Sequence, residues 1–354
     1  MAAMSTKTGP PGLKPLKRTE RKPIRLETGA LAVKEPYPEN GGLPLVYRPN
    51  HEAVNPSAWA GANRAAIEGD LLRHGALLFR GFGLKDIGAF EGFAKSICPE
   101  LLDYIERAAP RQPLGSKVFS STEYPADQWI PLHHEMSYSH NWPTKLFFYC
   151  AKAPKSGGTT PFTDERRVIG KIPEEIKRPF LEKKVMYVRN YGEGVDMPWQ
   201  EVFQTTDKAE VEAYLRKSFT AFEWLDRHRL RTKAVRQAVA THPQTGDVVW
   251  FNHAHMFHMS NLPTKVRQAL SEEFSPMAFP RNAFYGDGSP IADQAMAEVR
   301  RIYLESAYQF PWQEGDVLLL DNFLTAHGRP PFEGPRQICV AMAELYTNPD
   351  YVSE

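Results

Sequence analysis

Two stretches of the chain combine histidine with a carboxylate or with a glycine turn. His133 and Glu135 lie two residues apart, and His327 follows much later, between an apolar run and a glycine. Side chains two apart on a strand point to the same face, so His133 and Glu135 would face one spot and His134 the opposite side. Two histidines and one carboxylate can hold Fe(II) and leave positions open for a co-substrate and O2. Alone, the His133–Glu135 spacing is common by chance, and an ordinary hydrogen-bonding role is the alternative for each histidine.

Arg336 begins an apolar run shortly after His327. A buried arginine needs an anion, and a planar guanidinium suits a carboxylate at two points. 2-Oxoglutarate has such a carboxylate at one end and a keto acid that can chelate iron at the other. Thr160, in the motif GGTT, could give a hydroxyl to the same carboxylate. The alternatives are a structural ion pair for Arg336 and a turn role for Thr160.

Arg189 is a candidate contact for the substrate. It alternates with Tyr187 and Tyr191 on a predicted strand, so the three side chains would share one face. Arg189 could bind a substrate carboxylate there. A surface ion pair is an equally good interpretation.

Composition narrows the class of protein. The chain has 354 residues and a formal net charge of +1, from 43 basic and 42 acidic residues, so nucleic acid and acidic membranes are not expected partners. No apolar run approaches the ~20 residues of a membrane helix. Three widely separated cysteines form no disulfide or metal-binding pattern, which favours buried thiols and a cytoplasmic location.

The elements that must position these residues are short strands joined by long connections. Strands are predicted from apolar or alternating runs at 76–80, 145–150, 185–190, 247–252, 315–321 and 336–343. Helices are predicted from 55 or 57 to 74, from 86 to 97, from 209 to 219 and from 291 to 304. There is no internal repeat and no glycine-rich phosphate loop. The pattern therefore favours an α+β fold around a β-sandwich or jelly roll, rather than a doubly wound βαβ fold.

The chain is expected to have one folded domain. Residues 1–40 are predicted to be a disordered, basic, proline-rich arm because they offer few apolar residues to bury. Residues 41–354 would form a single domain. A polar, helical, lid-like insertion is expected around 192–243.

Taken together, the motifs PLHHEMSY, GGTTPF and DNFLTAHGR…GPR resemble the taurine dioxygenase (TauD/TfdA) family of Fe(II)/2-oxoglutarate oxygenases. The resemblance covers roughly 76 to 346. It is greatest for the branch of the syringomycin-pathway aspartyl hydroxylase, and the His-x-Glu motif is similar to that of clavaminate synthase. It implies a double-stranded β-helix (jelly roll) with flanking helices. By position, the resemblance makes iron ligands of His133, Glu135 and His327, and 2-oxoglutarate binders of Thr160 and Arg336.

The resemblance also implies an activity. The expected reaction hydroxylates an unactivated C–H bond of an amino acid or related small polar substrate, free or tethered to a carrier protein, in specialised metabolism. Asn252 and His255, in a histidine-rich segment, would lie beside that substrate, although three histidines there could also bind zinc. Most of the family has aspartate at the position of Glu135. The retained carboxylate argues against the halogenases, which have a small residue there.

Two alternatives accompany this prediction. The same cofactors could support desaturation or oxidative cyclisation instead of hydroxylation. A non-catalytic jelly roll that binds a small molecule is the third interpretation, and it does not explain why a complete ligand set accompanies Arg336.

Overall fold

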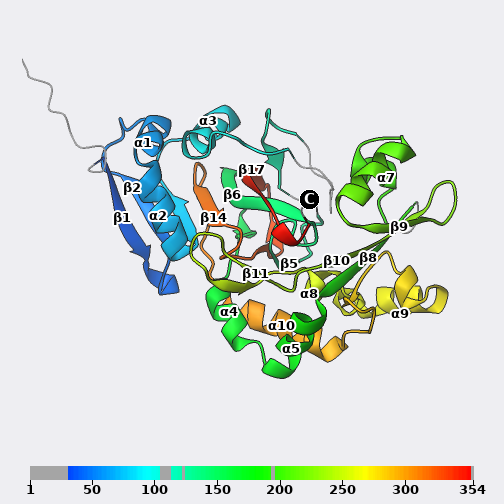
Figure 1. Ribbon diagram of the computed structural model, residues 1–354. Coiled ribbons are helices and arrows are strands. Elements are labelled where there is room, and N and C mark those ends of the chain that lie inside the picture. The colour runs from blue at the N-terminus through cyan, green and yellow to red at the C-terminus, as the bar shows by residue number, and fades with distance from the viewer. Residues whose placement is uncertain (1–30, 104–112, 122–123, 193–195, 352–354) are drawn as a thin grey trace, which may run out of the picture.

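A seven-stranded sheet is the largest element of the computed structural model, which describes residues 31–103, 113–121, 124–192 and 196–351 (Figure 1). Its strands follow the order β1 (Ala32–Tyr37), β2 (Gly42–Pro49), β3 (Ala76–Phe79), β14 (Val317–Asp321), β6 (Asn141–Lys152), β17 (Gln337–Thr347) and β4 (Phe119–Ser120). Among the strands of the described residues, only β2 and β3 pair in parallel. The sheet interleaves the two ends of the chain, because β14 lies between β3 and β6, and β17 pairs with β6.

Smaller sheets complete the strand content. A four-stranded sheet has the order β13 (Arg281–Tyr285), β8 (Val185–Tyr191), β10 (Leu230–Arg236) and β9 (Ala221–Trp224). Three pairs of short strands are β5 (Ile130–His133) with β15 (His327–Arg329), β7 (Ser156–Gly157) with β16 (Phe332–Glu333), and β11 (Val239–Thr241) with β12 (Val248–Trp250). All of these pairs are antiparallel.

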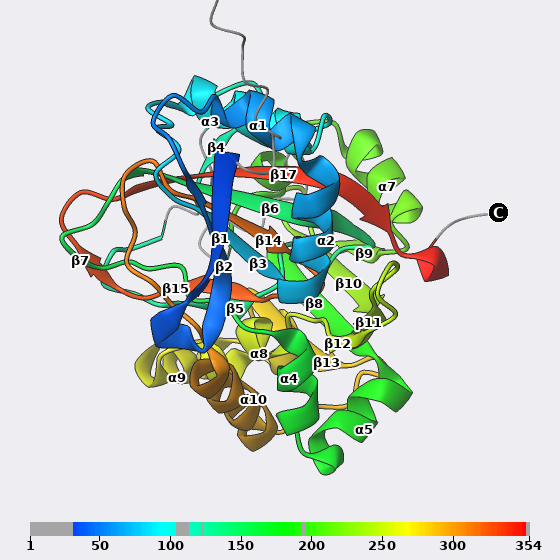
Figure 2. The same ribbon diagram turned by 90° about the vertical axis from the view of Figure 1, so that its left-hand side faces the viewer.

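The helices gather in groups around the sheets. They are α1 (Pro56–Ala62), α2 (Arg64–His74), α3 (Ile87–Ile97), α4 (Glu165–Lys171), α5 (Glu174–Lys183), α6 (Trp199–Phe203), α7 (Lys208–Lys217), α8 (Ala254–Phe257), α9 (Thr264–Glu273) and α10 (Asp293–Ser306). Figures 1 and 2 show α1–α3 grouped at one side of the molecule and α4, α5 and α10 at another. No helix within the described residues is long and apolar enough to cross a membrane.

The central strands are buried on both faces. Leu77 and Phe79 pack into a core formed with α1–α3. Leu78, Leu318 and Phe148, which have the opposite parity along their strands, pack into a second core that extends to the pairs β5–β15 and β11–β12. Because both faces are covered, these strands read as continuous apolar runs. The apolar runs in the sequence therefore predicted where these strands lie.

The strands predicted at 76–80, 145–150, 315–321 and 336–343 are confirmed as β3, β6, β14 and β17. The helix predicted up to residue 74 is divided into α1 and α2 at Asn63. Asn55 caps α1 by accepting a hydrogen bond from Ala58 N, and Gly75 ends α2 with a positive φ of 72°.

Two predicted boundaries differ from the structure. The arm expected at 1–40 includes residues of β1, which pairs along β2, and its remaining part, 1–30, lies outside the described residues. The insertion expected to be helical at 192–243 contains α6 and α7 but also β9, β10 and β11. Because β10 pairs with both β8 and β9, this segment extends the four-stranded sheet and is not wholly helical.

Candidate active site

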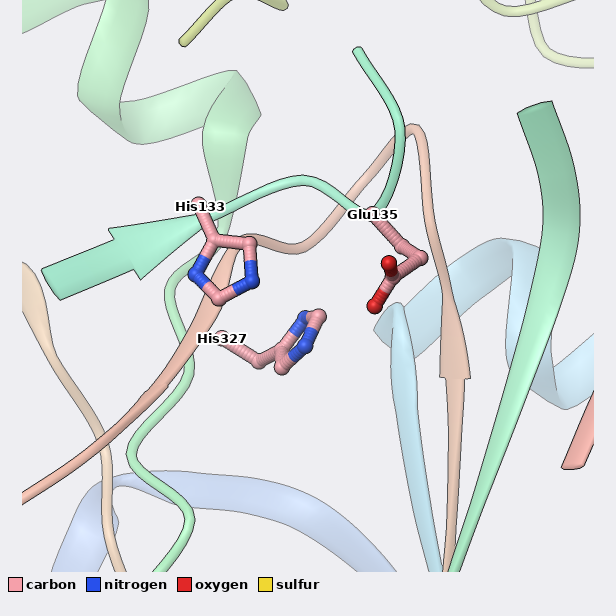
Figure 3. A group of neighbouring side chains, drawn as sticks. All are labelled: His133, Glu135 and His327. Atoms are coloured by element: carbon pink, nitrogen blue, oxygen red, sulfur yellow. The ribbon is translucent and has the colours of Figure 1, made fainter. Parts of the chain in front are cut away.

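His133, Glu135 and His327 point toward one another (Figure 3). One ligand atom from each side chain lies within 4.8 Å of the other two, and all three residues are buried. No other group of three metal-binding side chains in the described part of the chain meets this condition. The three histidines of the segment after β12, His253, His255 and His258, therefore do not form a zinc site of this kind.

Strand pairing brings the two histidines together. β5 ends at His133, β15 begins at His327, and the two residues are direct antiparallel partners. Their ring centroids are 4.6 Å apart, as expected for a cross-strand pair. Gly328 permits this close approach, because a Cβ there would lie 2.7 Å from the carbonyl oxygen of Ile130. The pairing explains how residues from distant parts of the chain share one site.

Glu135 reaches the cluster from a turn. β5 ends two residues earlier, and Met136 has a φ of 59°, in the left-handed region. The side chain of Asn322 fixes this turn: its Oδ1 accepts a hydrogen bond from Glu135 N (2.8 Å), and its Nδ2 donates to Glu135 O (3.0 Å). The expectation that His133 and Glu135 face one spot is met, but a side-chain clamp on a turn replaces the predicted alternation along a strand.

His134 has quite different surroundings. Its Nδ1 lies 2.7 Å from the carbonyl oxygen of Asn322, and its Nε2 lies 3.0 Å from that of Trp250. Carbonyl oxygens only accept, so a ring nitrogen that forms a hydrogen bond with one of them does so as the donor. Glu165, which is fully buried, places Oε2 3.6 Å from Nε2 of His134. His134 thus supports the site from behind and does not join the cluster.

A pocket adjoins His133 and His327, and both predicted 2-oxoglutarate binders, Thr160 and Arg336, line it. Its other lining residues are Ser121, Ile130, Phe148, Gly328, Arg329, Ile338 and Val340. Arg336 donates from Nε to Gly158 O at 2.8 Å. Burial, together with the nearby positive charge of Arg329, lowers the pKa of Arg336 to about 10. A cationic group between apolar walls suits a small anion with an aliphatic chain.

Arg189 is buried, but it does not line this pocket. Its Nη2 lies 3.4 Å from Asp196 Oδ2, and its guanidinium stacks over Tyr191 at 4.6 Å. Asp196 also binds Arg281, at 2.7 and 2.8 Å. Burial alone would raise the pKa of Asp196, but these two arginines hold it below its usual range. Arg189 therefore belongs to a buried ion cluster on the four-stranded sheet.

Asn252 and His255 also do not line the pocket. Asn252 donates to Ala238 O (2.8 Å) and accepts from Ala254 N (3.0 Å), so both ends of its amide bind the backbone. His255 places Nε2 2.7 Å from Leu132 O, and burial lowers its pKa to about 3, which makes the ring neutral. Both side chains therefore bind the backbone around the site, Asn252 just before the short helix α8 and His255 within it.

Their neighbour His253, predicted only as one of three histidines that could bind zinc, lies beside His133. Its ring centroid is 5.3 Å from that of His133, and its Nδ1 lies 2.6 Å from the hydroxyl oxygen of Ser137. Its backbone N–H donates to the hydroxyl of Tyr187 at 2.7 Å. The only signal in the sequence was membership of the histidine-rich segment. Which histidine of that segment faces His133, Glu135 and His327 depends on the direction that the chain takes after β12.

The donor set of the cluster fits Fe(II). Imidazole nitrogen and carboxylate oxygen are ligands that Fe(II) accepts, and three protein ligands on one side leave positions for other molecules. The clamp on Glu135 by Asn322 is the kind of outer contact that fixes a ligand in place. On these residues the site can hold iron next to a pocket for an anionic co-substrate.

Comparisons with known proteins agree with this chemistry. The family described as "Taurine catabolism dioxygenase TauD, TfdA family" matches residues 43–342. The dapdiamide synthesis protein DdaC of Enterobacter agglomerans is 41% identical over 278 residues, which cover 78% of this chain and 84% of DdaC. A clavaminate synthase-like protein of Arabidopsis thaliana is 33% identical over 289 residues, with the same coverages of 78% and 84%.

Solved structures show the same fold. PvcB from Pseudomonas aeruginosa superposes with a TM-score of 0.52 at 17% identity, over 86% of this chain and 88% of PvcB. Another structure of PvcB describes that protein as an Fe, alpha-ketoglutarate dependent oxygenase from an isonitrile synthetic pathway. The match to the family covers most of the chain, and both curated relatives exceed 30% identity. The chain is therefore a dioxygenase of the TauD/TfdA family.

Proposed function

We propose that this dioxygenase uses Fe(II), 2-oxoglutarate and O2 to hydroxylate an unactivated C–H bond of an amino acid or a related small polar molecule. We further propose that its strands form the double-stranded β-helix implied by the sequence resemblance. The observation that carries the proposal is that the histidine–carboxylate cluster and the pocket adjoin each other. The cluster of His133, Glu135 and His327 opens directly onto the pocket that contains Arg336 and Thr160.

In this proposal His133, Glu135 and His327 hold iron, and Arg336 with Thr160 holds the distal carboxylate of 2-oxoglutarate. When bound, iron and 2-oxoglutarate supply the oxidising power that puts one oxygen atom of O2 into the substrate, while 2-oxoglutarate becomes succinate and CO2. The chain itself fixes the ligand geometry through Asn322 and the β5–β15 pair. Precise placement of reactants and exclusion of water are what a protein adds to such cofactor chemistry.

The apolar walls of the pocket support this division of labour. Phe148, Ile338 and Val340 surround the space between the histidines and Arg336. They offer no hydrogen bonds to water, whereas the aliphatic middle of 2-oxoglutarate can pack against them. Arg336 then meets the carboxylate beyond this apolar section. A charge-assisted hydrogen bond between a guanidinium and a carboxylate is among the stronger polar contacts in a protein.

The substrate class is inferred from the relatives. DdaC is named as a protein of dapdiamide synthesis, and PvcB is described as belonging to an isonitrile synthetic pathway. We propose that this chain likewise works in specialised metabolism, on an amino acid that is free or tethered to a carrier protein. Desaturation or cyclisation would use the same site, and the product mass distinguishes them: hydroxylation adds one oxygen atom, whereas the other two reactions remove two hydrogens.

The decisive experiment supplies Fe(II), 2-oxoglutarate and O2 to the purified protein with a panel of free and carrier-loaded L-amino acids. We expect succinate formation that depends on one substrate class, with a product heavier by one oxygen atom in the mass spectrum. His327→Ala should abolish turnover, whereas His51→Ala, at an exposed histidine, should retain it. Failure of every substrate to stimulate succinate formation in the metal-loaded protein would favour the non-catalytic binding interpretation.

A further inference from the structure

We propose that Trp312 is a positioning residue for 2-oxoglutarate, acting through Thr160. The inference rests on the proposed function and adds to it a tryptophan that no motif marked. The indole Nε1 of Trp312 donates a hydrogen bond to Oγ1 of Thr160 at 3.3 Å, and both side chains are buried. Thr160 lines the pocket beside the histidine cluster, and Trp312 lies behind it.

The direction of this hydrogen bond determines what Thr160 can do. An indole N–H is only a donor, so Oγ1 of Thr160 accepts from Trp312 and its own hydrogen must point elsewhere. No acceptor for that hydrogen is present among the residues that the structure describes. A buried donor without an acceptor is costly, so the pocket favours a ligand with an acceptor at this place. The carboxylate that meets Arg336 is such an acceptor.

A buried ion pair holds the backbone on both sides of Trp312. Nη2 of Arg80 lies 2.7 Å from Oδ2 of Asp316, and both side chains are almost fully enclosed. Arg80 also donates to Pro311 O at 2.8 Å, while Oδ2 of Asp316 accepts from Gln313 N at 2.8 Å. The residues immediately before and after Trp312 are thus fastened to one ion pair.

Aromatic packing completes the support of the indole. The ring of Phe310 lies 5.0 Å from that of Trp312, and the guanidinium of Arg80 lies 5.7 Å from the Phe310 ring. The ion pair, the two aromatic rings and the Thr160 hydroxyl form a continuous series that ends at the pocket. Such supporting contacts are what keep a binding group in a productive orientation.

The role of Trp312 should show in the recognition of one end of the ligand. Arg336 and the oriented Thr160 hydroxyl would contact the distal carboxylate of 2-oxoglutarate, whereas the keto acid end belongs to the metal. 2-Oxovalerate has the same keto acid end and chain length but lacks that carboxylate. Its binding should therefore be independent of Trp312, which gives a matched probe for general damage to the pocket.

The test measures the dissociation constants of 2-oxoglutarate and 2-oxovalerate by calorimetry, using protein loaded with Mn(II) as a redox-stable substitute for Fe(II). For Trp312→Phe we expect about 3–10-fold weaker binding of 2-oxoglutarate. Thr160→Val should lose about as much or more, and the double variant no more than Thr160→Val alone, because both changes remove one linked interaction. Binding of 2-oxovalerate should stay within about twofold.

Trp142→Phe is the matched control, because the indole nitrogen of Trp142 is buried and has no hydrogen-bond partner in the described structure. It should leave 2-oxoglutarate affinity within about twofold of the wild type. If Trp312→Phe fails to fold, the indole of Trp312 can be replaced by the isosteric benzothiophene through an unnatural amino acid. That change removes only the N–H.

Three results would overturn the inference. They are an unchanged 2-oxoglutarate affinity in both Trp312 replacements, additive losses in the double variant, or an equal loss for 2-oxovalerate. Failure of the proposed function would look different, because the wild-type protein loaded with Mn(II) would then not bind 2-oxoglutarate at all.

Discussion

At the scale of single residues, the adjacent histidines His133 and His134 have opposite roles. His133 faces His327 and Glu135, whereas the ring nitrogens of His134 lie beside two carbonyl oxygens and Glu165. We expect His133→Ala to lose Mn(II) or Fe(II) binding while the protein stays folded. Calorimetric metal titration with an intact circular dichroism spectrum would check this. Retained metal affinity would remove His133 from the ligand set.

For His134 we predict the opposite effect, a loss of stability rather than a loss of metal binding. Replacement by alanine removes the ring's contacts with two buried carbonyl oxygens, those of Asn322 and Trp250, so we expect the free energy of unfolding to fall by about 2–4 kcal/mol. Metal affinity should change far less than in His133→Ala. Urea unfolding and metal titration on the same protein separate the two effects. A His134→Ala protein of wild-type stability that no longer binds metal would reverse the assignment.

Arg336 leads to a prediction about pH. Burial, first, and then the charge of Arg329 lower its pKa to about 10, so its positive charge is the form present at every pH below that value. Binding of a carboxylate favours the charged form further. The affinity of metal-loaded protein for 2-oxoglutarate should therefore not fall through this group between about pH 7 and pH 8.5, and should decline only near pH 10. Calorimetric titrations across this range, with Arg336→Gln as the uncharged reference, would reveal any earlier loss.

Residue type explains how much of the site the sequence could predict. The donors that iron and a dicarboxylate demand pointed to His133, Glu135, His327 and Arg336, and the family resemblance supported these and added Thr160. In the structure the first three form one cluster, and Arg336 and Thr160 line the pocket beside it. The substrate-side choices had no such chemical demand. They depended on which way single side chains turn after β12, and there the structure directs Asn252 and His255 toward the backbone.

At the scale of elements, a turn rather than a strand places Glu135 beside the two histidines. The sequence located β3, β6, β14 and β17, because strands buried on both faces are continuous apolar runs. It did not reveal that β5 stops at His133 and that Glu135 continues in a turn clamped by Asn322. Glu135 and Asn322 are far apart in the chain, so no local sequence pattern could predict the hydrogen bonds between them.

The turn at Gly157 and Gly158 gives a prediction at this scale. It joins β7 to the loop that carries Thr160, and it packs against β16. Gly157 has a φ of 65°, and a Cβ there would collide with the carbonyl oxygen of Pro331. Gly157→Ala should therefore separate β7 from β16, lower stability by about 1–3 kcal/mol and weaken 2-oxoglutarate binding.

The chain offers a matched control for that glycine. Gly170 lies within α4, and a Cβ there would meet nothing within 4 Å. Gly170→Ala should be neutral or slightly stabilising, by up to about 1 kcal/mol, because alanine favours a helix. Both variants can be compared by thermal unfolding and by calorimetry with 2-oxoglutarate. Equal behaviour of the two variants would mean that the geometry of the β7–β16 turn does not matter for the co-substrate.

At the scale of the whole molecule, the cluster of His133, Glu135 and His327 combines residues from two distant parts of the chain. β5 comes from the first half and β15 from near the end, and the seven-stranded sheet interleaves the same two regions through β14 and β17. Neither the composition nor the charge of the chain shows this interleaving. Pairing between distant strands leaves no periodic signal, and the insertion expected to be helical also contributes strands to a sheet.

This arrangement couples metal binding to the stability of the folded chain. The ligands meet only when β5 and β15 are paired, so a metal binds the folded state and not the unfolded one. At a free concentration 100 times its dissociation constant, such a ligand stabilises by about 2.7 kcal/mol, which corresponds to a rise in Tm of roughly 3–8 °C for a chain of this size. Thermal unfolding with Mn(II) should show this rise, and added 2-oxoglutarate should increase it.

The variants locate the source of that stabilisation. Glu135→Ala should remove most of the Mn(II)-dependent rise in Tm, whereas the backbone hydrogen bonds between residue 135 and Asn322, which hold the turn, can remain. Arg336→Gln should keep the rise caused by Mn(II) but lose the further rise caused by 2-oxoglutarate. If 2-oxoglutarate stabilised the Arg336→Gln protein as much as the wild type, its distal carboxylate would have to be bound elsewhere, and the proposed division of the site between metal and co-substrate would fail.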